Sequence, residues 1–419
     1  MFSKSSFRAA ALAMTLVAMA ACGPRDFPMT TRSDEARSHF QEALRYMDNY
    51  MNRQASESLQ KALAADSSFA LAYLYRGVLT NNPEEREKLF ERARKEAAEA
   101  SMAERTLIEA VIAWQSKDLD TALKQLETLR ETFPNDFRIT FTYGRVLFDK
   151  GEYPAAAQAF EQAVQLDSTT VAGFDWLANA YIRFGEYEKA KTFYRKAAEV
   201  TPEGGNPVLR YYGIAFAELY LGNVDAALAA MEEGLQDYLQ RNPEARPVFV
   251  YNSMARINLE NGRPEKALEL YEKGYSLVPN SNMSEMQKQL WLGRLHHGKA
   301  RSYAKMGDFR NAWKHARIVK KMLDAGGEQA KRFMPAYHYL VGYIYLEQNK
   351  PQKALEHLQQ ADQNDHFIRM LTARAYEMLG QADKARDLYA EIVNNPIGGL
   401  ERALVYNQAR EKLAQYAAQ

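Results

Sequence analysis

Small and large apolar residues follow two helical spacings along the chain, and the pattern returns after about 34 residues. Each unit has a first segment with a small residue at its middle, then a turn residue, then a second segment in which an alanine precedes a large apolar residue by four positions. In the unit Phe137–Thr170 these positions are Gly144, Gly151, Ala156 and Phe160. Apolar spacings of three and four residues predict amphipathic helices, so each unit predicts one antiparallel helix pair.

The units on either side keep the same register without an insertion. Val171–Gly204 has Ala178 at the small position and Gly185 at the turn, and Ala103–Asp136 has Ala110 at the small position. A small residue lets two paired helices approach closely, and glycine accepts the left-handed backbone that ends a helix. Three units in one register predict a solenoid in which each pair packs on the next.

Later units keep the pattern but become longer. Their turn residues and the alanines that follow are Gly222 with Ala227, Gly262 with Ala267, Gly307 with Ala312, Asn349 with Ala354, and Gly380 with Ala385. The sequence of Ser284–Gln287 is typical of a capping box, so we expect longer helices, not disordered loops, to contain the additional residues. Before residue 103 the pattern weakens, because the unit over 36–69 lacks the turn glycine.

This pattern resembles the tetratricopeptide repeat, a helix–turn–helix unit of 34 residues. The resemblance covers nearly all of the chain after residue 33 and implies an all-α fold, a right-handed solenoid of stacked antiparallel helix pairs. We expect degenerate repeat-like helices over 34–102, the solenoid over 103–397, and a C-terminal capping helix over 398–419, whose polar face suits the end of a solenoid. The segment 22–33 has two prolines and little apolar content, which indicates a tether.

Residues 1–21 have the pattern of an export signal. Two basic residues precede an uncharged apolar run that is too short to span a bilayer, which needs about 18 or more apolar residues. We therefore expect a signal peptide over these residues. The segment Met19–Cys22 resembles the lipobox of bacterial lipoproteins, although leucine is usual where Met19 stands. The resemblance implies that Cys22 is acylated, with palmitate among the attached chains, and becomes the new N-terminus.

Acylation at Cys22 would anchor the chain to a membrane, because two or more acyl chains anchor a protein stably. In bacterial lipoproteins an aspartate after the cysteine tends to retain the protein at the inner membrane, and Gly23 stands here. The resemblance thus implies a cell-envelope location, on the outer membrane facing the periplasm if the host is Gram-negative. In the alternative, Cys22 is an ordinary thiol beside a signal-peptidase site and the protein is a soluble periplasmic regulator.

Composition and motifs exclude several functional classes. Lys and Arg number 54 against 53 Asp and Glu, so the chain lacks the basic surface of a nucleic-acid binder. Cys22 is the only cysteine, which excludes an intrachain disulfide and a cysteine-rich zinc site. No metalloprotease, P-loop, dinucleotide-binding, EF-hand or serine-hydrolase motif occurs, and the histidines lack the spacing of a metal site. We therefore expect no catalytic residue, metal or cofactor, and no enzymatic activity.

The first helices of stacked units line the concave surface of a solenoid, where a ligand is expected. Aromatic and arginine residues, which are enriched at binding hot spots, recur at the positions that should face it. The candidate peptide-binding residues are Phe141, Arg145, Asn179, Arg183, Tyr212, Phe216, Asn252, Arg256, Arg301, Tyr339 and Tyr343. The repeated arginines favour an acidic peptide or a terminal carboxylate. The carboxylate clamp of chaperone adaptors is not expected, because Phe141 and Arg145 replace its lysine and asparagine.

These features predict a membrane-anchored scaffold that binds proteins or peptides, in envelope assembly, secretion or cell-wall processes. The alternative is a glycan-binding protein or an accessory subunit of an envelope enzyme complex, with sugars stacked on Trp114, Trp176 and tyrosines. Stacking on a sugar needs exposed rings, and the repeat pattern places Trp176 nearer to the packing between helices.

Overall fold

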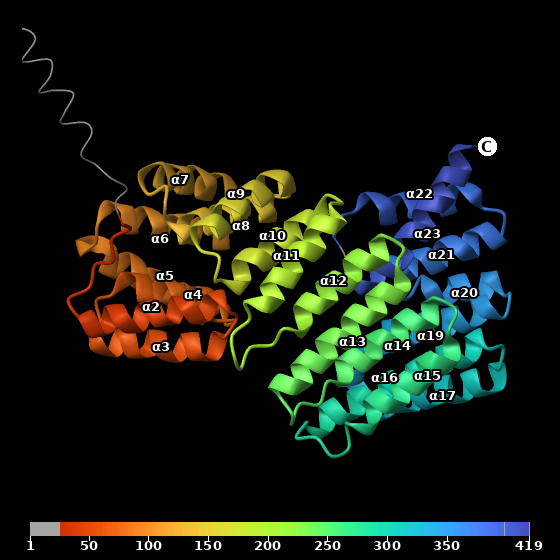
Figure 1. The fold of residues 1–419 in the computed structure, drawn as a ribbon. Coiled ribbons are helices and arrows are strands. Elements are labelled where there is room, and N and C mark those ends of the chain that lie inside the picture. The colour runs from red at the N-terminus through yellow and green to blue at the C-terminus, as the bar shows by residue number, and fades with distance from the viewer. Residues whose placement is uncertain (1–25, 398, 419) are drawn as a thin grey trace, which may run out of the picture. The chain divides into compact units, whose positions relative to one another are not determined.

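The computed structural model describes residues 26–397 and 399–418, which are almost entirely helical (Figure 1). No strand occurs in these two ranges. The all-α solenoid expected from the sequence is confirmed. The predicted signal peptide over 1–21 and Cys22 lie outside the described residues. No helix within the described ranges has the length and apolar composition needed to cross a bilayer.

The chain forms two compact units. Of the described residues, unit 1 contains those up to Tyr181 together with Glu199–Gly205, and unit 2 contains Ile182–Ala198 and those from Asn206 onward.

Unit 1 is built from consecutive helix pairs. They are α2 (Asp34–Asp48) with α3 (Asn52–Ala65), α4 (Ala70–Leu79) with α5 (Pro83–Glu96), α6 (Met102–Gln115) with α7 (Leu119–Thr132), and α8 (Phe137–Lys150) with α9 (Tyr153–Leu166). A 3-10 turn, η1 (Ala97–Glu99), follows α5, and α10 (Val171–Arg183) begins in this unit. The weak pattern over 34–102 therefore belongs to two regular helix pairs.

Packing requires the small residue at the middle of two first helices, α8 and α4. The Cβ of an alanine at Gly144 would lie 2.7 Å from the ring of Phe160, which is fully buried. Gly77 has the same relation to Phe90, at 2.4 Å. Each glycine thus makes room for an aromatic ring from the second helix of its own pair.

Unit 2 continues the same construction. Its helices are α11 (Tyr187–Glu199, of which Glu199 belongs to unit 1), α12 (Val208–Tyr220), α13 (Val224–Arg241), α14 (Val248–Glu260), α15 (Pro264–Ser276), α16 (Glu285–Lys305), α17 (Phe309–Ala325), α18 (Gly327–Ala330), η2 (Lys331–Phe333), α19 (Met334–Glu347), α20 (Pro351–Leu358), α21 (His366–Met378), α22 (Ala382–Asn394) and α23 (Leu400–Ala417). Three of them, α13, α16 and α17, contain 18, 21 and 17 residues and take up much of the additional sequence, as expected. The capping box of Ser284 with Gln287 is present at the start of α16.

The predicted turn residues all adopt a left-handed backbone. Their φ angles are positive at Gly151, Gly185, Gly222, Gly262, Gly307, Asn349 and Gly380. Where the sequence offers no glycine, the turn after α2 places Tyr50 at φ 57° and the turn after α6 places Lys117 at φ 67°. The turn geometry is therefore retained even where its preferred residue is missing.

The C-terminal helix α23 makes more contacts than a cap would need. It packs on α21 and α22 as an end cap should, and it also contacts α12 near the beginning of unit 2 (Figure 1). The Asn407 side-chain amide donates to the carbonyl of Leu219 at 2.8 Å, and the Tyr406 ring lies edge-on to Tyr220 at 5.3 Å. Unit 2 is thus closed by contacts between its first and last parts.

The segment expected as a tether differs from that expectation over its described residues. Phe27 and Met29 pack against the core of unit 1, and the Arg37 guanidinium donates to the carbonyl of Met29 at 2.8 Å. The segment docks because the side chains of Phe27 and Met29 lose contact with water when they pack on the core, which is favourable for apolar surface.

Candidate functional site

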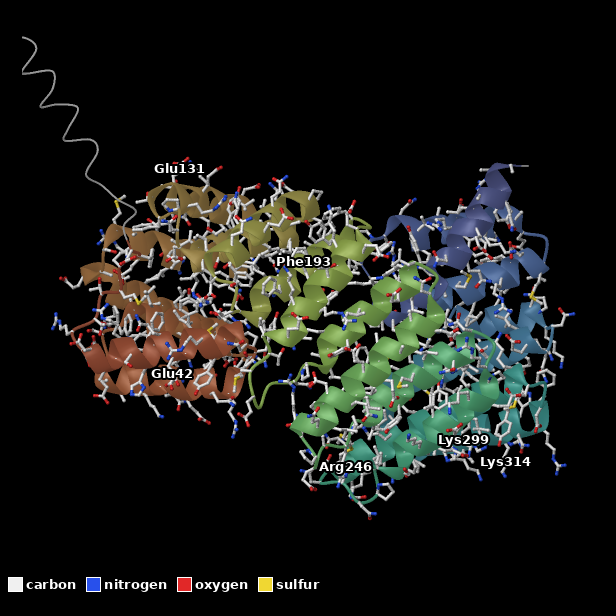
Figure 2. All side chains as sticks on the ribbon, in the orientation of Figure 1. Glu42, Glu131, Phe193, Arg246, Lys299 and Lys314 are labelled. Atoms are coloured by element: carbon white, nitrogen blue, oxygen red, sulfur yellow. The ribbon has the colours of Figure 1, made fainter. Side chains whose placement is uncertain are left out.

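The candidate binding residues divide between the two units. Side chains fill the spaces between the helices of each unit (Figure 2), and none of the candidates is fully exposed. Unit 1 contains Phe141, Arg145 and Asn179, and unit 2 contains the others. Those classed as buried are Phe141, Arg301, Tyr339 and Tyr343. Burial favours a supporting role for these four side chains.

In unit 2, three first helices bring several candidates together. The first helices α14, α16 and α19 contact one another in sequence and form a layer. Arg301 on α16 donates to Glu260 on α14 at 3.1 Å and to the Tyr339 hydroxyl on α19 at 2.8 Å. It also donates to the Tyr271 hydroxyl at 2.9 Å, and Tyr343 donates to Glu260 at 3.2 Å. With Arg256, these residues form what we call the arginine cluster.

Arg301 is the structural centre of the arginine cluster. Its side chain is 5% exposed and that of Glu260 is 8% exposed, so both charges are held away from water. Burial disfavours the charged guanidinium, but Tyr271, Tyr339 and Glu260 outweigh it and hold the pKa of Arg301 above its usual range. Burial also raises the pKa of Tyr339 to about 12. The Tyr339 hydroxyl therefore stays protonated at neutral pH.

Within the described part of the chain, hydrogen bonding is incomplete at two arginines of the cluster: Arg301 lacks a partner only at Nε, whereas Arg256 lacks one at two of its nitrogens. Its Nε lies 3.9 Å from Glu260, and its Nη1 lies 3.8 Å from Glu401 on α23. Both separations exceed hydrogen-bond distance, and Nε and Nη2 have no hydrogen-bond partner among the described residues. The guanidinium carbon lies 4.6 Å from the Phe367 ring centroid. A buried donor without an acceptor costs free energy, so the Arg256 guanidinium is suited to donate hydrogen bonds to a carboxylate.

In unit 1, Arg145 lies between two indole rings. Its guanidinium carbon is 3.5 Å from the Trp176 ring centroid and 5.1 Å from that of Trp114. Burial lowers the pKa of Arg145 to about 10, and its Nε has no hydrogen-bond partner in the described chain. Trp114 is 9% exposed and donates to Asp149 at 2.8 Å. Because Arg145 covers Trp176 and packing covers Trp114, these rings do not offer the open faces that sugar stacking requires.

The remaining candidates make contacts within their own unit. Phe141 stacks on Phe137 at 5.4 Å, inside the core. The Tyr212 hydroxyl donates to Ser253 at 3.0 Å and to the carbonyl of Phe249 at 3.1 Å.

The side chains of four other candidates are half-buried. Asn179 donates to the carbonyl of Asp175 at 2.7 Å, and Arg183 donates to that of Pro396 at 2.7 Å. Phe216 lies edge-on to Tyr212, and Asn252 is half-buried one turn before Arg256. Among the candidates of unit 2, the structure therefore gathers Arg256, Arg301, Tyr339 and Tyr343 into one cluster.

Two histidine pairs were not predicted. Nδ1 of His296 lies 2.8 Å from Nδ1 of His315, and Nδ1 of His338 lies 3.0 Å from Nδ1 of His357. Each pair joins the two helices of one repeat, and both pairs are separated by 19 residues, a repeated spacing that could have revealed them. Burial, and then the neighbouring His296, lowers the pKa of His315 to about 4. No group of three or more potential metal ligands occurs within the described ranges.

Comparison with known families agrees with this geometry. Models described as tetratricopeptide repeat match residues 107–169, 212–282, 174–203 and 369–396. The chain contains tetratricopeptide repeats. The matched ranges lie in both units and include α14, which carries Arg256 and Glu260.

Among curated proteins, the chain is 26% identical over 210 residues to anaphase-promoting complex subunit 3 of Schizosaccharomyces pombe, covering 49% of this chain and 27% of that protein. It is 24% identical over 233 residues to the anaphase-promoting complex subunit CDC16 of Saccharomyces cerevisiae, covering 55% and 25%. The chain thus spans about a quarter of the length of these two relatives. It is 22% identical over 300 residues to the TPR repeat-containing protein YpiA of Bacillus subtilis, covering 70% and 62%.

The solved structures that are similar to this chain include two further repeat assemblies of low identity. A tetratricopeptide repeat protein from Parabacteroides merdae has 17% identity and a TM-score of 0.47, covering 65% of this chain and 98% of that chain. The APC/C hetero-tetramer Cut9-Hcn1 has 14% identity and a TM-score of 0.37, covering 91% and 81%.

Proposed function

We propose that this protein is a non-catalytic scaffold that binds carboxylate-bearing segments of partner proteins at the arginine cluster of unit 2. The observation that carries the proposal is Arg256, a mostly buried guanidinium whose Nε and Nη2 lack acceptors. A planar guanidinium binds a carboxylate through two parallel hydrogen bonds, which gives both strength and orientation. The aromatic rings of Phe367 and Tyr339 beside it, with centroids at 4.6 and 5.8 Å, exclude water and strengthen such a contact.

A carboxylate of the chain itself supports this choice of ligand chemistry. Glu401, in the first turn of α23, is 40% exposed and approaches Nη1 of Arg256 to 3.8 Å. An acidic group thus already lies near the guanidinium but does not complete its hydrogen bonding. Nε and Nη2 are themselves buried, so a ligand carboxylate would satisfy them only by displacing Glu401 and shifting the neighbouring side chains.

Relatives support binding of proteins over binding of small molecules. Two of them are named as subunits of the anaphase-promoting complex, an assembly of proteins. Aromatic stacking of glycans, the alternative raised by the sequence, finds no support because Arg145 and packing cover the faces of Trp176 and Trp114.

Reversal of the charge at Arg256 tests the proposal. A photo-crosslinking amino acid at Asn252, one turn away on α14, is expected to capture partner proteins in cells, and Arg256→Glu is expected to abolish that capture because it repels a carboxylate. Arg256→Lys should leave partial capture, since lysine keeps the charge but loses the planar pair of donors.

The matched control is Arg263→Glu, which makes the same change in net charge at an exposed arginine, 43% accessible, that pairs with Asp225. It should leave the captured proteins unchanged. If Arg256→Glu captures the same proteins as the parent while retaining its unfolding transition, the carboxylate site at Arg256 is refuted.

For the N-terminus we propose that Cys22 carries acyl chains and holds the scaffold at a membrane of the cell envelope, the outer membrane in a Gram-negative host. The support is the lipobox-like segment Met19–Cys22 after a run typical of a signal peptide. Envelope assembly, secretion or cell-wall processes are the roles that such a position favours.

Cys22→Ser is expected to move the protein from the membrane fraction to the soluble fraction, because the acyl chains supply its membrane affinity. Labelling with an alkyne analogue of palmitate measures the modification, and fractionation on a sucrose gradient locates the membrane. Met102→Ala, at an exposed position on α6, serves as the control and should remain labelled and membrane-bound. Equal membrane binding of both variants without any label would contradict the anchor.

A further inference from the structure

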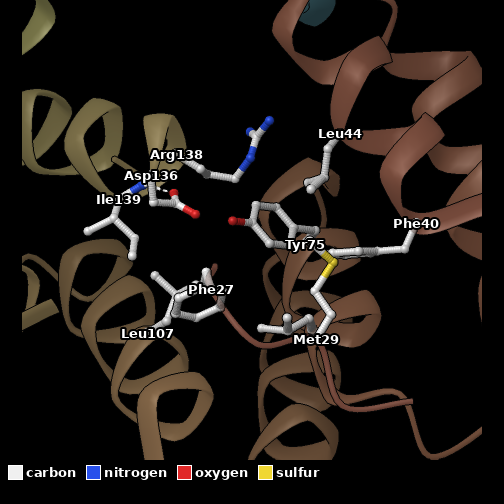
Figure 3. Close-up of a pocket in the computed structure, with 10 residues that line it drawn as sticks. Phe27, Met29, Phe40, Leu44, Tyr75, Leu107, Asp136, Arg138 and Ile139 are labelled. Atoms are coloured by element: carbon white, nitrogen blue, oxygen red, sulfur yellow. Dashed lines mark hydrogen bonds between the residues drawn. The ribbon is translucent and has the colours of Figure 1, made fainter. Parts of the chain in front are cut away.

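The N-terminal segment Phe27–Ser33 lies across unit 1 without forming a helix or strand and bends at Arg32, and we call it the strap. Together with the first helices of unit 1 it lines a partly open cavity of about 70 Å³ (Figure 3). The residues that line this cavity are Phe27 and Met29 of the strap, Phe40 and Leu44 of α2, Leu71 and Tyr75 of α4, Leu107 of α6, and Asp136, Arg138 and Ile139 at the start of α8. The strap therefore covers the same first-helix face on which a solenoid binds peptides.

Apolar contacts hold the first half of the strap. The Phe27 ring meets Phe133 edge-on at 5.3 Å, and Met29 packs with it against the core of unit 1. The cavity beside these two side chains is larger than the space for a single water molecule. The strap thus occupies the apolar part of this face without filling it.

Two carboxylates bind the second half of the strap. The backbone N–H of Thr30 donates to Oε1 of Glu104 at 2.6 Å, and the Thr30 hydroxyl donates to Oε2 of the same group. Next along the strap, the Thr31 hydroxyl and the Arg32 N–H both donate to Oδ2 of Asp66, at 2.6 and 2.9 Å. Carboxylates from two separate helix pairs, Glu104 and Asp66, thus bind consecutive residues of the strap.

Glu104 has the character of a recognition residue. It is 1% exposed, yet it faces a segment that is distant in sequence. Ser101 donates to its Oε2 through both the backbone N–H, at 3.1 Å, and the hydroxyl, at 2.8 Å, as part of a capping box. Its Oε1 accepts a hydrogen bond from the backbone N–H of Thr30. Any peptide with a free backbone N–H at this position can supply the same donor, whatever its side chain.

We propose that the first-helix face of unit 1 is a binding site for a peptide with an aromatic residue, an apolar residue two positions later and a threonine directly after it, and that the strap is its resident ligand. A partner segment of this chemistry binds by replacing the strap. This site is separate from the arginine cluster in residues and in ligand chemistry, so it goes beyond the function proposed above.

Replacement by a partner follows from the way the strap is held. It has no helix or strand hydrogen bonding of its own, and it is secured by two apolar side chains and a few hydrogen bonds. When a tethered segment occupies a site, the apparent affinity for a competing ligand is the intrinsic affinity multiplied by the fraction of molecules in which the site is open. Weakening the strap should therefore expose the affinity of the site for the same sequence supplied in trans.

The experiment uses the full-length chain and a fluorescein-labelled synthetic peptide of residues 26–33, with binding followed by fluorescence anisotropy. In the parent protein the peptide is expected to bind weakly, because the strap occupies the site. Phe27→Ala with Met29→Ala in the protein is expected to tighten peptide binding by about tenfold or more. A peptide that carries Phe27→Ala should bind neither protein.

Glu104→Gln, added to the strap-weakened protein, is the decisive variant. Glutamine retains the capping box at the start of α6 if its amide oxygen takes the place of Oε2, and its NH₂ group then takes the place of Oε1, where it cannot accept the Thr30 backbone N–H. Peptide binding should fall to the level of the parent protein. A thermal unfolding curve shared by the two variants establishes that both are folded.

Equal peptide affinity of the parent and strap-weakened proteins would overturn the proposal, as would binding that is unaffected by Glu104→Gln. A parent protein that sediments as a dimer and becomes monomeric with Phe27→Ala and Met29→Ala would overturn it as well, because the strap would then dock on a second copy. None of these results depends on Arg256, so failure here leaves the carboxylate site in unit 2 separately testable.

Discussion

Replacing Arg301 with alanine is expected to lower the free energy of unfolding of unit 2 by about 3–5 kcal/mol, because it leaves a buried carboxylate without its partner. Glu260 would lose the 3.1 Å ion pair with Arg301, and the hydroxyls of Tyr271 and Tyr339 would lose a common donor. Urea unfolding followed by circular dichroism measures the change.

Arg263→Ala is the matched control for this effect. Arg263 also pairs with an aspartate, but both side chains are exposed, so its loss should cost less than about 1 kcal/mol. A second variant, Arg301→Met with Glu260→Met, removes both charges and should recover much of the lost stability. If Arg301→Ala is no more destabilising than Arg263→Ala, the arginine cluster does not stabilise unit 2.

Phe160→Ala is expected to destabilise unit 1 by about 3–5 kcal/mol, because it empties the space between two helices of a pair. Phe160 is fully buried, and its ring fills the room that Gly144 leaves on α8. Met102→Ala, at a methionine that is 78% exposed, should change the stability by less than about 0.5 kcal/mol. Urea unfolding again provides the measurement.

A double-mutant cycle makes the Phe160 prediction specific. Gly144→Ala adds a methyl group 2.7 Å from the Phe160 ring and should destabilise the parent protein, whereas in the Phe160→Ala background the same methyl has room. Additive effects of the two substitutions would contradict the interlocking of glycine and ring.

The repeat pattern predicted most of the fold because its positions have direct steric meaning. The turn residues, the capping box at Ser284 and the final helix over Leu400–Ala417 occur where the sequence places them. The first pairs were less clear because Tyr50 occupies the turn position that glycine usually takes. Such a residue reaches positive φ only when the surrounding packing compensates for the strain, and packing is not visible in a sequence.

The candidate site was predicted only in part. The pattern places Arg256, Arg301 and Tyr339 on first helices, but how deeply each is buried depends on neighbours from other repeats. The approach of Glu401 to Arg256 joins positions 145 residues apart, which no local spacing encodes. The strap was missed for a similar reason. Phe27 and Met29 have no helical periodicity, and their docking depends on a face built by helices far along the chain.

The contact between α23 and α12 has a consequence for cooperativity. In an open repeat array each repeat contacts only the repeats next to it, so the terminal repeats can unfold while the middle stays folded. In unit 2 the Asn407 side chain bonds to Leu219, and Arg183 bonds to the carbonyl of Pro396, across 188 and 213 residues. Loss of the final helix therefore also removes contacts from the first part of the unit. These contacts raise the free energy of local unfolding at both ends of unit 2. We therefore expect the slowly exchanging amide hydrogens of unit 2 to exchange together, as one cooperative unit.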